Sequence, residues 1–291
     1  MREYEYHAPE SFESLVNLAS GDGAEVRFLA GGTDLIPRIS AEKNQIPYEK
    51  KLPMRIIYLG TLGLDKVTEE GERVTIGACC TLSSLLENEI VKTKMPALRD
   101  ALSEMAGVSI RNTATIGGNI MNASPAADSV PPLLVLDAVC ALRSASGERR
   151  VSLAEYFTGP GKTVAKPDEV LVSITVKPGP GGSSFKKLGR RKAETLSVVN
   201  AAVYLELRDG FCQSARVAVG SAAPTVVRCV DVEQALVGKK IDEGVVREAS
   251  LLVTKAISPI DDIRSSAWYR ARVAPIMVAR AVLTAAGRKR G

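Results

Sequence analysis

The 291-residue sequence contains a single histidine, His7, and its five cysteines include no Cys-x-x-Cys pair. Structural zinc sites and iron–sulfur clusters normally use closely spaced cysteines or histidines, so we expect no metal site and buried or incidental cysteines. The shortage of histidine also removes the catalytic mechanisms that depend on an imidazole. The sequence therefore predicts no catalytic side chain.

Aromatic residues are also scarce, at 4%, and the net charge is only +5, so little is available to stack on bases and a nucleic-acid partner is not expected. The longest apolar run, VPPLLVLDAVCAL, is too short to span a bilayer. The N-terminal MREYEYHAPE has no apolar core of a signal peptide, so a cytoplasmic location is expected. The chain length predicts two or three packed units.

Helix and strand signals are mixed along the whole chain. Residue 107 to residue 121 is expected to be irregular, and Ser124-Pro125 is typical of a helix start. Predicted helices cover about residues 11–19, 82–91, 95–105, 131–138, 244–257 and 262–286, the last kinked or broken near Pro275. Predicted strands cover 25–30, 55–59, 73–78, a hairpin over 139–151, then 169–176, 197–207 and 215–219, with a turn at Asp209-Gly210. Without regular alternation of strands and helices, this order favours an α+β fold over a Rossmann sheet.

Two glycine pairs are the features that most need an explanation. LAGGTDLI (29–36) follows a predicted strand, and TIGGN (115–119) precedes the Ser-Pro signal. Glycine-rich turns can aim main-chain N–H groups at a diphosphate without a Cβ in the way, so two such loops could hold a dinucleotide between them. Ordinary tight turns are the alternative reading. Neither loop contains Gly-x-Gly-x-x-Gly, and TGPGKT (158–163) has Tyr156 where a Walker A motif needs its first glycine.

The two motifs together, LAGGTDLI and IRNTATIGGNIMNASPAADSVPPLLVLDA, resemble the flavin-binding medium subunits of the molybdenum hydroxylases, the xanthine dehydrogenase and aerobic carbon monoxide dehydrogenase family. The resemblance extends through FTGPGKT, PDEVLVSITV, FKKLGRRKA, VAVGSAAPTVVRC and DIRSSAWYR. It implies a two-subdomain FAD-binding fold of the vanillyl-alcohol-oxidase (PCMH) type followed by a C-terminal α+β domain. The implied boundaries are 1–55, 56–177 and 178–291, and the Pro/Gly-rich KPGPGG (177–182) independently indicates a linker there.

The resemblance also implies which residues contact FAD. Asp128 matches a contact position, although an Asp in the first turn of a helix is also favoured by the helix dipole. Asn119 could bind the cofactor or hold its loop closed, and Met105 could equally belong to the core. Lys186 could place positive charge by the flavin ring or be solvated. The implied cofactor-binding set is Leu29, Ala30, Gly31, Gly32, Thr33, Asp34, Leu35, Ile36, Met105, Thr115, Ile116, Gly117, Gly118, Asn119, Asp128, Leu171 and Lys186.

The same resemblance implies a larger assembly. Electrons would come from a large molybdenum-cofactor subunit through [2Fe-2S] clusters of a small subunit, reach FAD on this chain, and leave to NAD+, a quinone, oxygen or a carrier. The basic run Arg190–Lys192 could be a docking patch or a solvated surface. The cysteine-bearing insertion of the 4-hydroxybenzoyl-CoA reductase branch is absent from 120–138, so an additional [4Fe-4S] cluster is not expected.

Two other functions remain open from the sequence. The chain could be a structural or nucleotide-binding subunit without redox activity, or a free-standing FAD reductase of related fold. The second alternative needs a group that protonates its substrate, and the sequence offers no convincing candidate. Neither the substrate of the complex nor its electron acceptor can be read from this chain.

Overall fold

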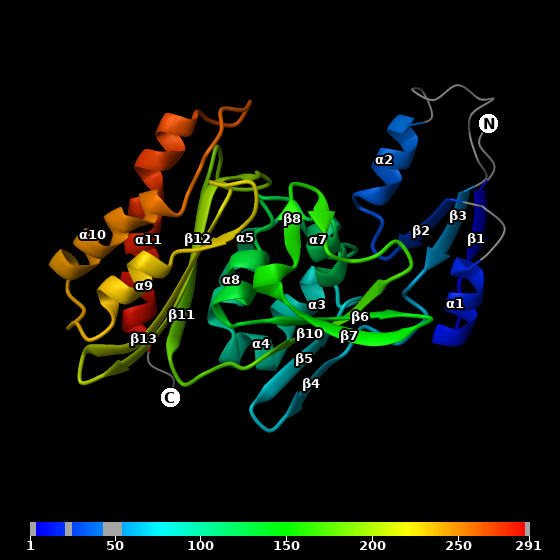
Figure 1. The fold of residues 1–291 in the computed structure, drawn as a ribbon, viewed down its shortest axis with the longest axis horizontal. Coiled ribbons are helices and arrows are strands. Elements are labelled where there is room, and N and C mark those ends of the chain that lie inside the picture. Colours follow the sequence, from blue (N-terminus) through cyan, green and yellow to red (C-terminus); the bar gives the residue numbers. More distant parts are fainter. Residues whose placement is uncertain (1–3, 21–24, 43–53, 289–291) are drawn as a thin grey trace.

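Three main sheets follow one another along the chain in the computed structural model, which describes residues 4–20, 25–42 and 54–288. The N-terminal sheet lies at the right of Figure 1, the middle sheet with its helices at the centre, and the C-terminal sheet at the left. Helices and mainly antiparallel strands share the chain, so the fold belongs to the predicted α+β class.

The first sheet is parallel, in the order β1 (Tyr4–His7), β3 (Met54–Tyr58), β2 (Glu25–Leu29). Helix α1 (Phe12–Ala19) lies between β1 and β2, and α2 (Leu35–Glu42) follows β2. Strand and helix therefore alternate here, which the sequence analysis missed because it did not detect the short β1. The predicted division between residues 55 and 56 falls inside β3, which pairs with β2 as far as Tyr58.

The second sheet is antiparallel and forms the centre of the molecule. Its order is β4 (Val67–Glu70), β5 (Arg73–Gly77), β10 (Val170–Val176), β6 (Val139–Ser144), β7 (Gly147–Ser152). The β6–β7 pair is the predicted hairpin. A small ribbon of β8 (Phe157–Gly159) and β9 (Lys162–Thr163) lies nearby, after a 3-10 turn at Leu153–Glu155. The helices of this part are α3 (Leu82–Glu87), α4 (Glu89–Lys94), α5 (Pro96–Glu104), α6 (Val108–Arg111), α7 (Ile116–Met121) and α8 (Val130–Val135).

The predicted helix over 82–91 is two helices, divided at Asn88. The Asn88 side-chain oxygen accepts hydrogen bonds from the N–H groups of Ile90 at 3.0 Å and Val91 at 3.2 Å. Asparagine is a strong helix N-cap, so it ends α3 and begins α4. Thr81 caps α3 as predicted, accepting from Ser84 N at 3.0 Å.

The segment around the second glycine pair differs from the prediction in two ways. Residues 107–121, expected to be irregular, contain α6 and α7. Ser124 begins a turn, where its hydroxyl accepts from Ala126 N at 3.2 Å, while the next helix begins only after Ser129. Asp128 therefore precedes α8 and does not lie in a first helical turn.

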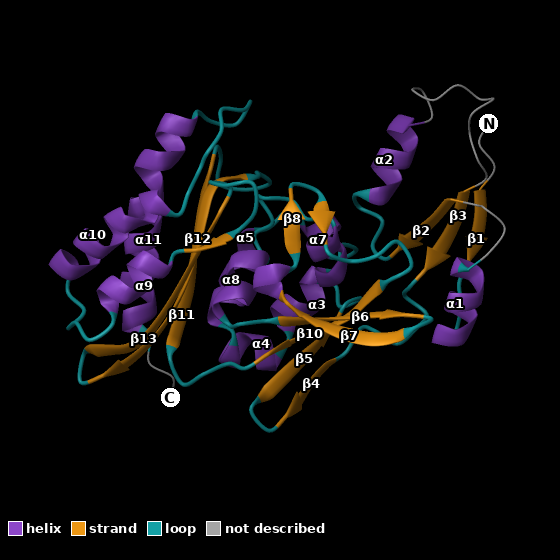
Figure 2. Cartoon of the chain, in the orientation of Figure 1, coloured by secondary structure: helices purple, strands orange, loops and turns teal. Residues whose placement is uncertain are grey.

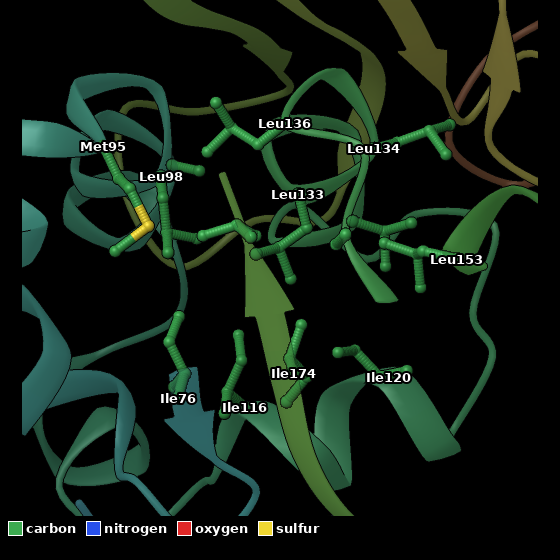
Figure 3. Packing of buried hydrophobic residues seen from close by; sticks show 14 of the residues in the cluster. Ile76, Met95, Leu98, Ile116, Ile120, Leu133, Leu134, Leu136, Leu153 and Ile174 are labelled. Atoms are coloured by element: carbon green, nitrogen blue, oxygen red, sulfur yellow. The ribbon is translucent and has the colours of Figure 1, made fainter. Parts of the chain in front are cut away.

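The main core lies between the middle sheet and the helices that cover it. Ile76 and Ile174 point from the sheet, Ile116 and Ile120 from α7, and Leu133 from α8 (Figure 3). All five side chains are fully buried. Burial of such aliphatic side chains is the dominant stabilising term in a fold of this kind.

The third sheet is covered by helices on both faces. Figure 2 shows α9, α10 and α11 on its outer face and α5 and α8 between it and the middle sheet. Odd positions of β12 such as Val203 pack with the outer helices, and even positions such as Tyr204 pack with the middle core. The elements are β11 (Gly182–Gly189), β12 (Ser197–Arg208), β13 (Phe211–Gly220), β14 (Val227–Arg228), α9 (Val230–Leu236), α10 (Glu243–Leu251), a 3-10 turn at Leu252–Lys255, and α11 (Ala267–Gly287).

The third part differs from the prediction in β11 and α11, and agrees with it in the turn at Asp209-Gly210. Strand β11 was not predicted, because its sequence GSSFKKLG is largely polar. Helix α11 is continuous through Pro275 and begins after Ser266, later than the predicted residue 262. The turn at Asp209-Gly210 is confirmed, with positive φ of 54° and 81° at its two residues, as hairpin turns require.

The residues that precede α11 are organised by Asp262. Its carboxylate accepts hydrogen bonds from Arg264 N at 2.8 Å, Ser265 N at 3.2 Å and the Arg270 guanidinium at 2.6 Å. Burial alone would raise the pKa of Asp262, but these hydrogen bonds outweigh it and lower the pKa to about 2. Residues 262–266 therefore form a turn that is held by Arg270, a buried residue in the first turn of α11.

This network predicts a pH-dependent contribution to stability. A carboxyl pKa that falls from 3.8 to about 2 on folding stabilises the protein above pH 3.8, and the contribution is lost as the pH falls through 2. We expect Asp262→Asn to lower the free energy of unfolding by about 2 kcal/mol at neutral pH, measured by urea denaturation. The difference from wild type should shrink between pH 4 and pH 2. Asp168→Asn, an exposed acid, is the control; an equal loss in both variants would contradict the assignment.

Candidate functional site

A cavity of about 980 Å³ lies where the three parts of the chain meet. The first part contributes β2 and the loop that follows it, up to Arg38 in α2. The second contributes residues around Met105, the second glycine motif Thr115–Asn119, which forms the N-cap and first residues of helix α7, the 124–128 turn, and the start of β10. The third contributes Glu194, Thr195 and Leu196 from the β11–β12 connection.

The first glycine loop lines this cavity and has main-chain donors that the protein does not use. In the part of the chain that the structure describes, the N–H groups of residues 31–34 form no hydrogen bond. Gly31 is required by packing, because a Cβ there would lie 2.0 Å from the carbonyl oxygen of Thr113. Gly32 has a φ of +71°, which disfavours any residue with a side chain. The loop is thus held open against the 113–114 backbone with its donors free for an anionic group.

The second glycine loop has a different role. The Gly117 N–H bonds to the oxygen of Ala78 at 2.9 Å, and the Gly118 N–H bonds to the Thr115 hydroxyl at 3.1 Å. A Cβ on Gly117 would lie 2.6 Å from Ala78. These glycines therefore let α7 lie directly on the neighbouring chain, and Gly118, which lines the cavity, keeps space open. Their N–H groups are already used within the protein.

Most of the predicted cofactor residues lie on the cavity wall. Those that line it are Ala30, Gly31, Gly32, Thr33, Asp34, Leu35, Met105, Thr115, Gly117, Gly118, Asn119, Asp128 and Leu171. Four do not line it. Leu29 packs with Ile39, Met54 and Ile56, and Ile116 points into the main core (Figure 3). Ile36 is 47% exposed on α2, and Lys186 lies on the far face of β11.

Lys187, the neighbour of Lys186, contacts a residue of the cavity wall, Asp128. Cross-strand partners share a face of a sheet, and Lys186 pairs with Ala201, which packs against the outer helices. Lys187 pairs with Asn200 on the opposite face, the one that packs against the middle part of the chain. The sequence carried a signal for this, because Lys187 is two residues after Phe185 and so shares its buried face.

Lys187 and Asp128 form a buried ion pair between the third part and the second. The Nζ–Oδ2 distance is 2.7 Å, and the two side chains are 4% and 6% exposed. The other carboxylate oxygen accepts from the Ser197 hydroxyl at 2.5 Å and from the Asn200 amide at 2.7 Å. Asp128 therefore fastens the C-terminal sheet to a turn that lines the cavity. Its predicted contact with FAD stays a prediction.

Asn119 holds its own loop. Its side-chain oxygen accepts a hydrogen bond from the Ser129 hydroxyl at 2.6 Å, which ties α7 to the beginning of α8. This is the closing role that the sequence left open beside cofactor binding. Asn119 also lines the cavity, so the second role stays open.

Two titratable groups on the cavity wall are kept in one charge state. The Glu169 carboxylate bonds to the Arg149 guanidinium at 2.6 and 2.8 Å, and this hydrogen bonding lowers its pKa. Burial raises the pKa of the Cys79 thiol to about 11, so the thiol is protonated at neutral pH. Neither group can exchange a proton readily near neutral pH. The sequence analysis missed both, along with Arg38 and residues 194–196.

Within the described ranges, no cluster of His, Cys, Asp and Glu has the geometry of a metal site. No described helix is long and apolar enough to cross a membrane. A cavity between two glycine-containing loops, with free main-chain donors on one wall, is typical of a protein that binds a nucleotide cofactor.

The comparisons with known proteins specify that class. Residues 2–178 match the FAD binding domain in molybdopterin dehydrogenase, and residues 183–285 match the CO dehydrogenase flavoprotein C-terminal domain. The chain is 32% identical to the xanthine dehydrogenase FAD-binding subunit of Escherichia coli O157:H7, over 98% of this chain and 97% of the relative. It is 31% identical to the carbon monoxide dehydrogenase medium chain of Afipia carboxidovorans, over 98% and 97% of the two chains.

The fold agrees with a solved relative. A chain of carbon monoxide dehydrogenase from Hydrogenophaga pseudoflava superposes with a TM-score of 0.91 at 30% identity, over 99% of this chain and 98% of that one. The protein therefore belongs to the family of FAD-binding medium subunits of molybdenum hydroxylases, and it is an oxidoreductase flavoprotein subunit. Free donors on the first loop and the space left by Gly118 fit this cofactor.

The Lys187–Asp128 pair generates a prediction about stability. Removing one partner of a buried ion pair leaves an uncompensated charge and typically costs about 3–5 kcal/mol. We expect Lys187→Met to cost that much in urea denaturation. Adding Asp128→Asn should recover part of the loss, because the remaining partner is then uncharged. Lys186→Met, on the opposite face of the strand, is the matched control. A double variant no more stable than Lys187→Met alone would contradict the pairing.

Proposed function

We propose that this chain is the electron-transfer subunit of a molybdenum hydroxylase or dehydrogenase complex. It would take electrons from [2Fe-2S] clusters of a small partner subunit, which are supplied by a large molybdenum-cofactor subunit. It would pass them to NAD+, a quinone, oxygen or a carrier. Named relatives, the medium chains of carbon monoxide dehydrogenase among them, support this proposal.

The observation that carries the proposal is the unequal chemistry of the two glycine loops around one cavity. Free N–H groups at 31–34 suit the diphosphate of FAD, and the tightly packed 115–119 loop leaves room for it. When bound, FAD supplies the electron-accepting and electron-donating chemistry, while the protein binds and orients it. Leu171 and Met105, both nearly buried on the cavity wall, suit apolar contact with the flavin ring.

We further propose three structural parts, the first ending at Tyr58 where β3 ends, the second at about residue 177 and the third from 178. A cytoplasmic location is part of the proposal, and five unpaired, buried cysteines are compatible with a reducing compartment.

The glycine loops generate the test of cofactor binding by mutation. Gly32→Val forces a branched side chain into a left-handed conformation, and Gly118→Val places one in the cavity. We expect both variants to lose FAD, measured by the flavin absorbance per mole of protein, while the far-ultraviolet circular dichroism remains that of the wild type. Full FAD occupancy in both would contradict the assigned site. Gly63→Ala is the control, because Gly63 also has a left-handed conformation but lies away from the cavity. This variant should keep its FAD.

The visible absorption spectrum of the purified chain, with chromatographic identification of the released chromophore, tests the proposal as a whole. Near-stoichiometric FAD is expected. A colourless chain that stays colourless when FAD is added would favour the structural-subunit alternative. Co-purification with molybdenum and iron–sulfur subunits separates the proposed role from that of a free-standing flavin reductase.

A further inference from the structure

Arg38 lies on the cavity wall one helical turn after the first glycine loop. Its Nε lies 2.7 Å from the carboxylate of Asp34 in an ion pair spaced i, i+4. Its Nη2 donates to the side-chain oxygen of Asn122 at 2.6 Å. The guanidinium therefore extends from α2 of the first part to the C-terminal end of α7 in the second.

This guanidinium retains donors for a ligand. Arginine carries five N–H groups in a planar fork, and phosphate oxygens match that fork. The hydrogen bond to Asn122 uses one N–H on Nη2, the ion pair with Asp34 lies on the Nε side, and Arg38 has no other side-chain partner in the described part of the chain. The side chain is 60% exposed, so a ligand in the cavity can reach it.

The positive charge of Arg38 also offsets the negative charge of Asp34 within the site. Asp34 lines the same cavity, and its carboxylate belongs to the loop whose free N–H groups suit a diphosphate. Two anionic groups in one partly enclosed space repel each other. Arg38 is the cation that contacts Asp34 directly, so it offsets the carboxylate while offering its remaining donors to the ligand.

We infer that Arg38 is a diphosphate-binding residue of the FAD site and that it neutralises Asp34 there. The inference rests on the proposed function, because it needs FAD in this cavity. It assigns the two side chains opposite effects on cofactor affinity. Loss of Arg38 exposes the diphosphate to an unpaired carboxylate, whereas loss of the Asp34 charge does not.

Fluorescence titration of the FAD-depleted full-length chain tests this. We expect Arg38→Gln to weaken FAD binding by about tenfold or more, as for loss of a charge-assisted hydrogen bond. Asp34→Asn should bind FAD at least as tightly as wild type, and the double variant should bind more tightly than Arg38→Gln alone. Salt should weaken FAD binding by wild type more steeply than by Arg38→Gln.

Arg150→Gln is the matched control, because Arg150 is also an exposed arginine beside a carboxylate, that of Glu148, and does not line the cavity. FAD affinity unchanged in Arg38→Gln would overturn the inference. Equal weakening in Arg38→Gln, Asp34→Asn and the double variant would also overturn it, since that pattern marks a pair that only stabilises α2. If the wild-type chain binds no FAD, the proposed function fails as well; if wild type and Arg38→Gln bind equally, only this inference fails.

Discussion

The buried carboxylate of Asp128 is the contact on which the arrangement of the parts depends. A charge that is 6% exposed is tolerated only when it is paired and hydrogen-bonded. All of its side-chain partners come from the C-terminal sheet: Lys187 on β11, and Ser197 and Asn200 on β12. These bonds hold the turn that carries Asp128 against β11 and β12, and Ser197 directly follows residues 194–196, which line the cavity.

The two glycine pairs look alike in the sequence but have different structural roles. The 31–34 loop has free N–H groups, and its shape is imposed by Gly31 packing on the Thr113 carbonyl. The 115–119 motif is the start of helix α7 and uses its N–H groups internally, and Gly117 allows contact with Ala78. The backbone just before the second motif supports the first loop, because Gly31 packs on Thr113 and Ala114. Binding and support are divided between the two loops.

Strands and hairpins that show alternating hydrophobicity and turn residues could be predicted from the sequence. Helix boundaries that are set by side-chain hydrogen bonds to the main chain could not. The strands around Asp209-Gly210 and the β6–β7 hairpin follow from alternation and turn residues. The break at Asn88 and the late start of α11 depend on main-chain N–H groups that bond to the side chains of Asn88 and Asp262. Local sequence patterns predict such bonds poorly. At the site, Lys186 came from the family resemblance and its contact with the flavin stays a prediction; the alternation along β11, which was not recognised as a strand, directs Lys187 to the side of the sheet that holds Asp128.

The scarcity of acid–base side chains fits the character of this site. A subunit that passes electrons does not need to move a substrate proton with its own side chains, because the cofactor carries the reactive atoms. What it needs is a fixed position and a fixed charge around the cofactor. Glu169 is held ionised by Arg149, Cys79 is held protonated by burial, and Asp34 and Asp128 are each paired with a cation. The fixed charge states of Glu169 and Cys79 and the ion pairs of Asp34 and Asp128 thus surround the cavity with groups that position a cofactor and supply no acid or base for catalysis.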